Sequence, residues 1–233
     1  MQSKWVKNKE EIENIWKGQH IVDEVYQNIL EWIQEGYTEK YVVEYIKKRF
    51  VELGGEKEAF DTIVAFGSNA AEPHHVASDR ALKNNEFVLV DMGVVVGEMC
   101  SDFTRTFFFG DEIGEEEVKV YNIVKDAQEI GLKCVKDKML ARDVDGVVRE
   151  EIGSKGYGEY FVHGTGHGVG KEIHEYPRLG KGSDDVVENG MVVTIEPGIY
   201  VKGKIGVRIE DMLIVGSNER MSKHNTDLIK IVR

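Results

Sequence analysis

The chain has 233 residues, with 30 lysine and arginine residues against 42 aspartate and glutamate residues, so its formal net charge is −12. This acidic balance disfavours nucleic acid as a partner, because phosphate binding needs a basic surface. Hydrophobic residues make up 41% and charged residues 31% of the chain, which excludes a disordered or collagen-like protein. We expect one folded domain over residues 1–233.

The two cysteines, Cys100 and Cys134, are too few for a disulfide framework, and neither belongs to a CxxC pattern. The first residues, MQSKWVKNKEEIENIW, are polar where a signal peptide would be apolar. No apolar run approaches the roughly 20 residues that span a bilayer. We therefore expect reduced cysteines, no membrane partner and a cytoplasmic protein.

The first half of the chain is predicted to contain two helices followed by strands. Apolar residues at helical spacing predict a helix over about residues 8–36 and a second from Thr38 to the Gly54-Gly55 pair. The segment FGSNAAEPHHVASD is rich in turn residues and is predicted to be a loop. The runs EFVLVDMGVVV and CSDFTRTFFFG, separated by Gly97-Glu98, predict a hairpin.

The second half repeats this order. The pattern predicts one helix over roughly residues 115–139, a shorter one over roughly residues 143–154, and then strands. The strand-like runs MVVTIEPGIYV and IGVRIEDMLIVG flank a Lys-Gly-Lys turn. The repeated order suggests an internal duplication, although the two halves share little residue identity.

Four acids lie within otherwise apolar or β-prone runs: Asp91 in LVDMG, Asp102 in CSDFTRT, Glu196 in VTIEPG and Glu210 in VRIED. Acidic side chains are rarely buried unless they are paired or bind a metal. One such acid is equally well explained as an exposed strand position, but two pairs, one in each half, favour a shared site. Strand alternation also places Arg208 on the face of Glu210, which it can orient.

Two divalent cations would balance four carboxylate charges. The segment FVHGTGHGVGKEIHEYP offers His163, His167 and His174 as further ligands. Glycines on both sides of His167 permit an irregular backbone close to a metal. Four oxygen donors and one imidazole favour Mn²⁺, with Co²⁺, Fe²⁺ or Zn²⁺ as alternatives.

The ordered motifs PHH, VDMG, SDFTRT, HGTGHGVGKEIHE, TIEPGIY and VRIED resemble those of the M24 metallopeptidases, which include methionine aminopeptidases, aminopeptidase P and prolidase. This resemblance extends from about Ile12 to the end of the chain. It implies an α+β pita-bread fold with an internal pseudo-two-fold duplication and helices packed outside a curved, mostly antiparallel sheet. It also implies that two metal ions are bound by Asp91, Asp102, His167, Glu196 and Glu210, with Asp102 and Glu210 bridging them. The complete ligand set argues against the family's metal-free relatives.

The details of two motifs resemble aminopeptidase P and prolidase more than methionine aminopeptidase. His163 precedes His167 by four residues in HGTGHG, and Arg208 precedes Glu210 by two residues. The resemblance therefore implies hydrolysis of the Xaa-Pro bond at the N-terminus of dipeptides or short peptides, through a hydroxide that bridges the metals.

The same resemblance assigns roles to the remaining site residues. The catalytic group is His74 on the substrate side, His174 at the transition state, and Glu196, which would carry a proton from the nucleophile to the leaving proline nitrogen. The substrate-binding group is His163, Tyr200 and Arg208, and the arginine would also keep the region of Glu210 and Asp102 in register.

Other reactive side chains are given no role. His75 adjoins His74, and only one of two adjacent residues on extended chain is expected to face a site. His20 and His224 are interpreted as surface or hydrogen-bonded core histidines. Cys100 is interpreted as a small buried apolar side chain rather than a reactive thiol.

Two other functions stay open: a methionine or general aminopeptidase, and a non-catalytic peptide-binding module that retains the metal site. Prolidases and aminopeptidases P usually carry a domain before the catalytic one. The first predicted helix begins almost at residue 1, so we expect that domain to be absent. The expected partners are a short peptide with proline in the second position and, as one oligomeric state, a homodimer.

Overall fold

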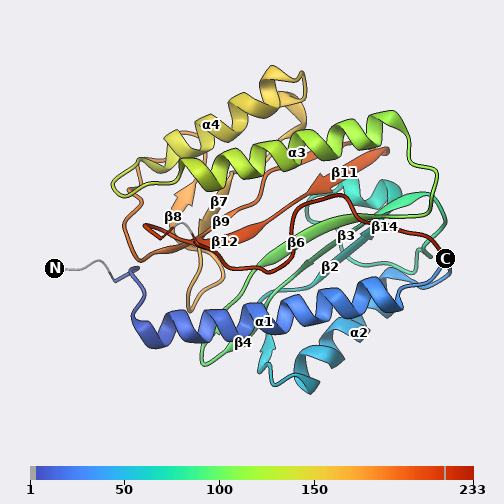
Figure 1. Ribbon diagram of the computed structural model, residues 1–233, viewed down its shortest axis with the longest axis horizontal. Coiled ribbons are helices and arrows are strands. Elements are labelled where there is room, and N and C mark those ends of the chain that lie inside the picture. Colours follow the sequence, from blue (N-terminus) through green and yellow to red (C-terminus); the bar gives the residue numbers. More distant parts are fainter. Residues whose placement is uncertain (1–3, 218) are drawn as a thin grey trace.

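Two helix pairs flank the strands in the computed structural model, which describes residues 4–217 and 219–233 (Figure 1). The first pair is α1 (Lys9–Trp32) and α2 (Glu39–Glu52), and the second is α3 (Glu115–Cys134) and α4 (Ala141–Ser154). Each pair precedes strands of its own half, which confirms the predicted order of helix, helix and strands. Among the described residues, no helix is both long and apolar enough to cross a membrane.

Local side chains explain where the first two helices begin. The Asn8 side chain accepts a hydrogen bond from the Glu11 amide while Glu11 binds the Asn8 amide, which is a capping box. Thr38 caps α2 in the same way, through the Tyr41 amide. The predicted first helix was too long, because Ile33 is already extended, with ψ of 139°. The predicted third helix was also too long and ends at Cys134.

Two larger sheets carry most of the strands. The four-stranded sheet has the order β14-β6-β3-β2, with β2 (Ile63–Phe66), β3 (Glu86–Met92), β6 (Phe103–Phe109) and β14 (Lys230–Ile231). The five-stranded sheet has the order β13-β12-β9-β7-β8, with β7 (Gly166–Gly168), β8 (Glu175–Leu179), β9 (Val192–Ile195), β12 (Asp211–Ile214) and β13 (Glu219–Arg220). Within the described chain only the β14–β6 pair is parallel, as expected for a mostly antiparallel fold.

Shorter elements complete the strands. One small sheet contains β1 (Lys57–Glu58), β4 (Val94–Val96) and β5 (Met99–Cys100), and another contains β10 (Gly198–Val201) and β11 (Ile205–Arg208). The turn between β4 and β5 is made by Gly97 and Glu98, with φ of 56° and 65°. Two positive φ values are those of a type I′ hairpin turn, so the predicted hairpin is confirmed. Two 3₁₀ turns, η1 (Gly67–Ala71) and η2 (Gly158–Tyr160), connect strands and helices.

A bridge between strands joins the two halves next to the acidic residues. In the first half, β3 and β6 pair with Asp91 opposite Thr104. Thr104 also forms an isolated antiparallel bridge with Glu210, whose amide donates to the Thr104 carbonyl at 3.0 Å. The acids of both halves are therefore brought to one seam.

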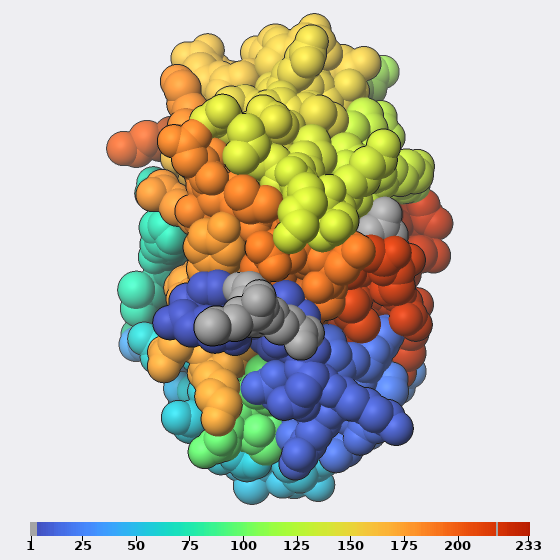
Figure 2. Space-filling view, turned by 90° about the vertical axis from the view of Figure 1, so that its left-hand side faces the viewer, coloured from blue at the N-terminus to red at the C-terminus, as the bar shows by residue number. Residues whose placement is uncertain are grey.

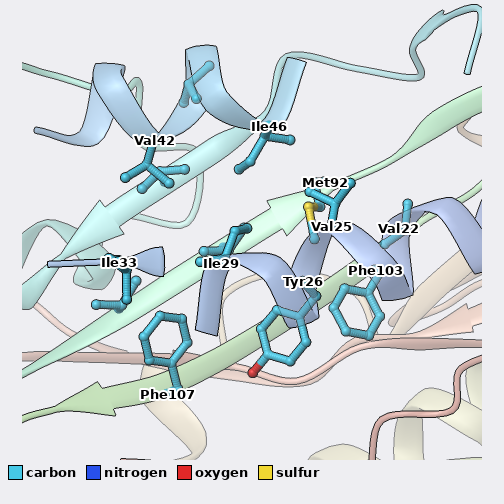
Figure 3. Packing of buried hydrophobic residues seen from close by; sticks show 14 of the residues in the cluster. Val22, Val25, Tyr26, Ile29, Ile33, Val42, Ile46, Met92, Phe103 and Phe107 are labelled. Carbon is cyan, nitrogen blue, oxygen red and sulfur yellow. The ribbon is translucent and has the colours of Figure 1, made fainter. Parts of the chain in front are cut away.

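The largest core cluster holds the first helix pair against the four-stranded sheet (Figure 3). Tyr26 of α1 lies edge-on to Phe103 of β6, with ring centroids 5.3 Å apart. Val22 and Ile29, one turn away on either side, are fully buried. Burial of this apolar face fixes β3 and β6, and with them the residues at the seam.

Candidate metal centre

A cavity of about 750 Å³ opens over the seam. Its walls include all five predicted metal ligands, Asp91, Asp102, His167, Glu196 and Glu210. They also include four of the predicted catalytic and substrate-binding residues, His74, His163, His174 and Arg208. Side chains from both halves of the chain thus converge on one space.

Three of the predicted ligands form the tightest group. Donor atoms of Asp102, His167 and Glu210 lie within 4.8 Å of one another. Asp102 stands just before β6, and Glu210 stands between β11 and β12. Both carboxylates are buried, so a cation placed among them would replace their lost hydration.

His167 presents its Nε2 atom to the acids. Its Nδ1 atom lies 3.1 Å from the Gly168 carbonyl. Because a carbonyl only accepts hydrogen bonds, Nδ1 carries the hydrogen and Nε2 keeps its lone pair. Nε2 lies 3.5 Å from Asp102 Oδ2 and 3.4 Å from Glu196 Oε1. This is the tautomer that a metal ligand requires.

The glycines beside His167 permit close contact with neighbouring strands. A Cβ atom on Gly166 would lie 2.0 Å from the Thr194 carbonyl, and one on Gly168 would lie 2.2 Å from the Tyr176 carbonyl. The β7–β8 register also shifts between His167 and Gly168. The irregular backbone predicted from the sequence is therefore present, and its cause is the close approach of β8 and β9.

The protonation states of the site follow from burial. Burial, together with the neighbouring acids, raises the pKa of Asp102 and of Glu210 well above the usual range. Burial also raises the pKa of Glu196 to about 8. Burial and the nearby His174 lower the pKa of His167 to about 4, so its imidazole is neutral at pH 7. A divalent cation binds neutral imidazole and ionised carboxylates. A bound cation would therefore offset the repulsion among these acids and stabilise their ionised forms.

Arg208 supplies one positive charge behind these acids. Its Nη2 donates to Asp91 Oδ2 at 2.5 Å, and its Nε donates to Thr104 Oγ1 at 3.3 Å. Thr104 in turn donates to Glu210 Oε2 at 2.6 Å. The predicted alignment of Arg208 with Glu210 is thus indirect, because the direct ion pair is with Asp91.

Asp91 retains an unused acceptor. Its Oδ1 atom is buried and has no hydrogen-bond partner among the described residues. A buried carboxylate oxygen without a donor is costly unless a cation binds it. The donor set of oxygens with one imidazole therefore fits divalent metal ions.

His163 and Tyr200 form a pair beside Arg208. His163 Nδ1 lies 2.8 Å from the Gly164 carbonyl, and its Nε2 lies 2.8 Å from the Tyr200 hydroxyl, which also accepts from Arg208 Nη1 at 2.8 Å. Burial lowers the pKa of His163 to about 4, so the ring is neutral. Both ring nitrogens are engaged, and the Tyr200 side chain is buried behind the cavity rather than on its wall.

The remaining histidines lie in different surroundings. His74 and His174 are exposed on the cavity wall, and His174 lies against His167 with ring centroids 4.3 Å apart. His75 points elsewhere, with Nε2 2.8 Å from Glu39 Oε2. His224 binds the Asp23 carbonyl at 2.8 Å, as a hydrogen-bonded core histidine does.

Two groups that support the site were missed in the sequence. Arg105, the largest fully buried side chain, pairs with Asp211 at 2.7 Å and donates to the Glu210 carbonyl at 2.6 Å. On α4, Asp145 accepts from the amide and hydroxyl of Thr165 at 3.1 and 3.0 Å. The only signal for Arg105 is a charge inside the β-prone run FTRTFFF.

The second of these groups fixes the histidine segment. Arg149 donates to the carbonyls of Phe161 at 2.9 Å and His163 at 2.7 Å, and makes two bonds of 2.9 Å to Asp145. The Thr165 carbonyl accepts from the Glu196 amide at 2.8 Å. We call Asp145 and Arg149 the α4 clamp, because it connects the backbone of the histidine segment and Glu196 to one helix.

Buried acids from both halves of the chain and a neutral imidazole line one cavity, which is the arrangement of a protein that holds divalent metal ions. A profile of metallopeptidase family M24 matches residues 13–217, and the chain belongs to this family. The fold is the pita-bread fold expected from the motifs, with known relatives superposing closely.

Three relatives illustrate the similarity. An uncharacterised peptidase of Staphylococcus aureus is 43% identical over 210 residues, covering 90% of this chain and 60% of the relative. A dipeptidase of Pyrococcus horikoshii superposes with a TM-score of 0.94 at 42% identity, covering 97% of this chain and 64% of that one. An Xaa-Pro dipeptidase of Bacillus anthracis gives a TM-score of 0.95 at 41% identity, with the same coverages. The chain thus spans less than two thirds of the length of these relatives.

Proposed function

We propose that this chain is a metal-dependent peptidase that cleaves the bond between an N-terminal residue and proline in dipeptides or short peptides. The observation that carries the proposal is the convergence of four acids and His167 on one cavity whose wall also holds His74, His163, His174 and Arg208. The similarity to proteins named Xaa-Pro dipeptidase and prolidase supports this substrate class.

We infer a site for two divalent ions held by Asp91, Asp102, His167, Glu196 and Glu210, with Mn²⁺ as the preferred ion. Four carboxylates need more compensation than the one guanidinium of Arg208 provides. When bound, such ions lower the pKa of a water molecule and polarise the scissile carbonyl. Asp102 and Glu210, which come from the two halves of the chain and belong with His167 to the tightest donor group, would both hold the ions.

Glu196 is the proposed proton carrier. Its carboxylate is partly exposed to the cavity, and Thr194 Oγ1 donates to its Oε1 at 3.5 Å. From this position Glu196 accepts a proton from the attacking water and delivers it to the proline nitrogen. The nitrogen of an Xaa-Pro amide carries no hydrogen, so it must gain a proton to leave.

The cavity histidines are proposed to act on the peptide. His174, exposed beside His167, donates a hydrogen bond to the oxygen that becomes negative when the carbonyl is attacked. His74 faces the peptide from the opposite half of the chain. His163 offers the face of its ring, because both nitrogens are bound within the protein, while Tyr200 and Arg208 hold that ring in place.

Product analysis by mass spectrometry tests this function. Protein stripped of metal and reconstituted with Mn²⁺ is incubated with an Xaa-Pro dipeptide, an Xaa-Pro-Xaa tripeptide and a Met-Ala-Xaa tripeptide, with a chelated sample as control. We expect cleavage before proline only, and the preferred length distinguishes the prolidase from the aminopeptidase P type. Cleavage of the methionyl peptide alone would indicate a methionine aminopeptidase. No cleavage despite bound Mn²⁺ would favour a peptide-binding module.

A further inference from the structure

The first described residues of the chain are fastened beside the cavity. The Lys7 amide donates to the Gly190 carbonyl at 2.9 Å, and Val6 and Tyr176 both pack against the core cluster that contains Leu179 and Met191. Lys7 Nζ forms an ion pair with Glu175, and both side chains are at most 6% exposed. Figure 2 shows this start of the chain in blue, beside orange segments of the second half.

The ion pair has an effect on the neighbouring wall. Glu175 lies between His174 and Tyr176 in sequence and lines the cavity. Because Lys7 neutralises its charge, and Lys7 Nζ also binds the Trp5 carbonyl at 2.7 Å, Glu175 adds no unpaired charge beside the rings of Trp5 and Tyr176, although Arg178 and Asp185 line the same cavity. The proposed metal ligand His167 lies against His174, with ring centroids 4.3 Å apart.

Trp5 and Tyr176 form that aromatic surface. Their rings are stacked with centroids 6.2 Å apart and planes at 22°. Both side chains line the cavity and both are only half-buried, so part of each ring faces the open space. Ile173 lines the cavity on the same stretch of chain. Aromatic rings that are fixed in place bind apolar groups with little loss of side-chain entropy.

We propose that Trp5 and Tyr176 bind the side chain of the peptide's N-terminal residue and determine its selectivity in favour of large apolar side chains. This inference rests on the proposed function. His174 faces the carbonyl of the N-terminal residue, and the side chain of that residue is attached one carbon away. Tyr176 follows His174 by two residues and lines the same cavity, so its ring and the stacked ring of Trp5 stand next to that side chain. The proline ring lies across the scissile bond.

The test compares Leu-Pro with Gly-Pro as substrates of the Mn²⁺-loaded protein. We expect Trp5→Ala to lower the ratio of kcat/KM for Leu-Pro to that for Gly-Pro by about tenfold or more, the range expected when a leucine side chain loses its apolar contacts. Trp5→Phe should restore most of the ratio. Trp16→Ala is the matched control, because Trp16 packs on His20 of α1 outside the cavity, and should leave the ratio unchanged.

The outcomes separate this inference from the proposed function. An equal fall for both substrates in Trp5→Ala would mean that Trp5 only anchors the segment, and would overturn the inference while the function stands. If no Xaa-Pro substrate is cleaved, the function fails, and binding of Leu-Pro is followed by tryptophan fluorescence instead. A response that persists unchanged in Trp5→Phe would then overturn the inference, whereas its loss would support it.

Discussion

Removing the guanidinium of Arg149 should weaken both the fold and the proposed catalysis, because the α4 clamp holds the backbone around His163. Arg149→Met deletes four hydrogen bonds, two to backbone carbonyls and two to Asp145, which is 2% exposed. Hydrogen bonds to a charged group contribute about 1.5–3 kcal/mol each when buried. The Arg149 side chain is 27% exposed, so we discount this sum and expect a loss of about 2–4 kcal/mol in the free energy of unfolding.

The control lies on the same helix. Arg142 pairs with Asp184, whose side chain is 82% exposed, so Arg142→Met should cost less than about 1 kcal/mol. Urea unfolding gives both free energies, and hydrolysis of an Xaa-Pro dipeptide gives kcat/KM. We expect Arg149→Met to lower kcat/KM by about 10–100-fold, as loss of a residue that supports metal ligands does. Arg149→Lys should retain only part of the stability and of kcat/KM, since lysine lacks the planar guanidinium group that makes several hydrogen bonds at once. Equal stability and activity in the two methionine variants would refute the role of the clamp.

Three further changes probe the centre itself. Glu196→Gln should lower kcat by about 10²–10⁴-fold without lowering the melting temperature, and a wild-type rate would contradict the proton-carrier role. Thr104→Val removes the hydrogen bond to Glu210 and should weaken Mn²⁺ binding, measured by calorimetry, by about 10–100-fold. An unchanged affinity for Mn²⁺ would contradict the role of Thr104 in orienting Glu210. Burial raises the pKa of Glu196 from 4.5 to about 8, so the metal-free fold favours the uncharged carboxylic acid. The protonated Glu196 therefore stabilises the metal-free fold fully below pH 4.5, and this stabilisation is lost as the pH rises toward 8. The gain in melting temperature on adding Mn²⁺ to chelated protein should therefore be larger at pH 8 than at pH 5.5, and an equal gain would contradict this.

The sequence predicted the fold well where the spacing of apolar residues agreed with the positions of capping and turn residues. Asn8 and Thr38 mark the starts of α1 and α2, and Gly97-Glu98 marks the hairpin, because caps and type I′ turns depend on residues close in sequence. Helix ends were less predictable. The apolar spacing continues past Trp32, but Ile33 leaves the helix and still packs in the core.

In the candidate site, the sequence likewise revealed some residues and not others. Acids inside apolar strands stood out, and the structure brings them to one cavity. The supporting residues did not stand out. Asp145 and Arg149 are four positions apart, a spacing typical of an exposed helix face, and only tertiary contact buries the aspartate. The Arg105 and Asp211 pair joins residues 106 positions apart, which no local pattern reveals.

The bridge between Thr104 and Glu210 offers a way to measure metal occupancy, through hydrogen exchange of a backbone amide. The Glu210 amide is bonded to a carbonyl of the opposite half, so its hydrogen exchanges only when the halves separate locally. Ions held by donors from both halves would tie the halves together and slow that exchange. The exchange rate of this one amide would therefore report metal binding directly, with no substrate present.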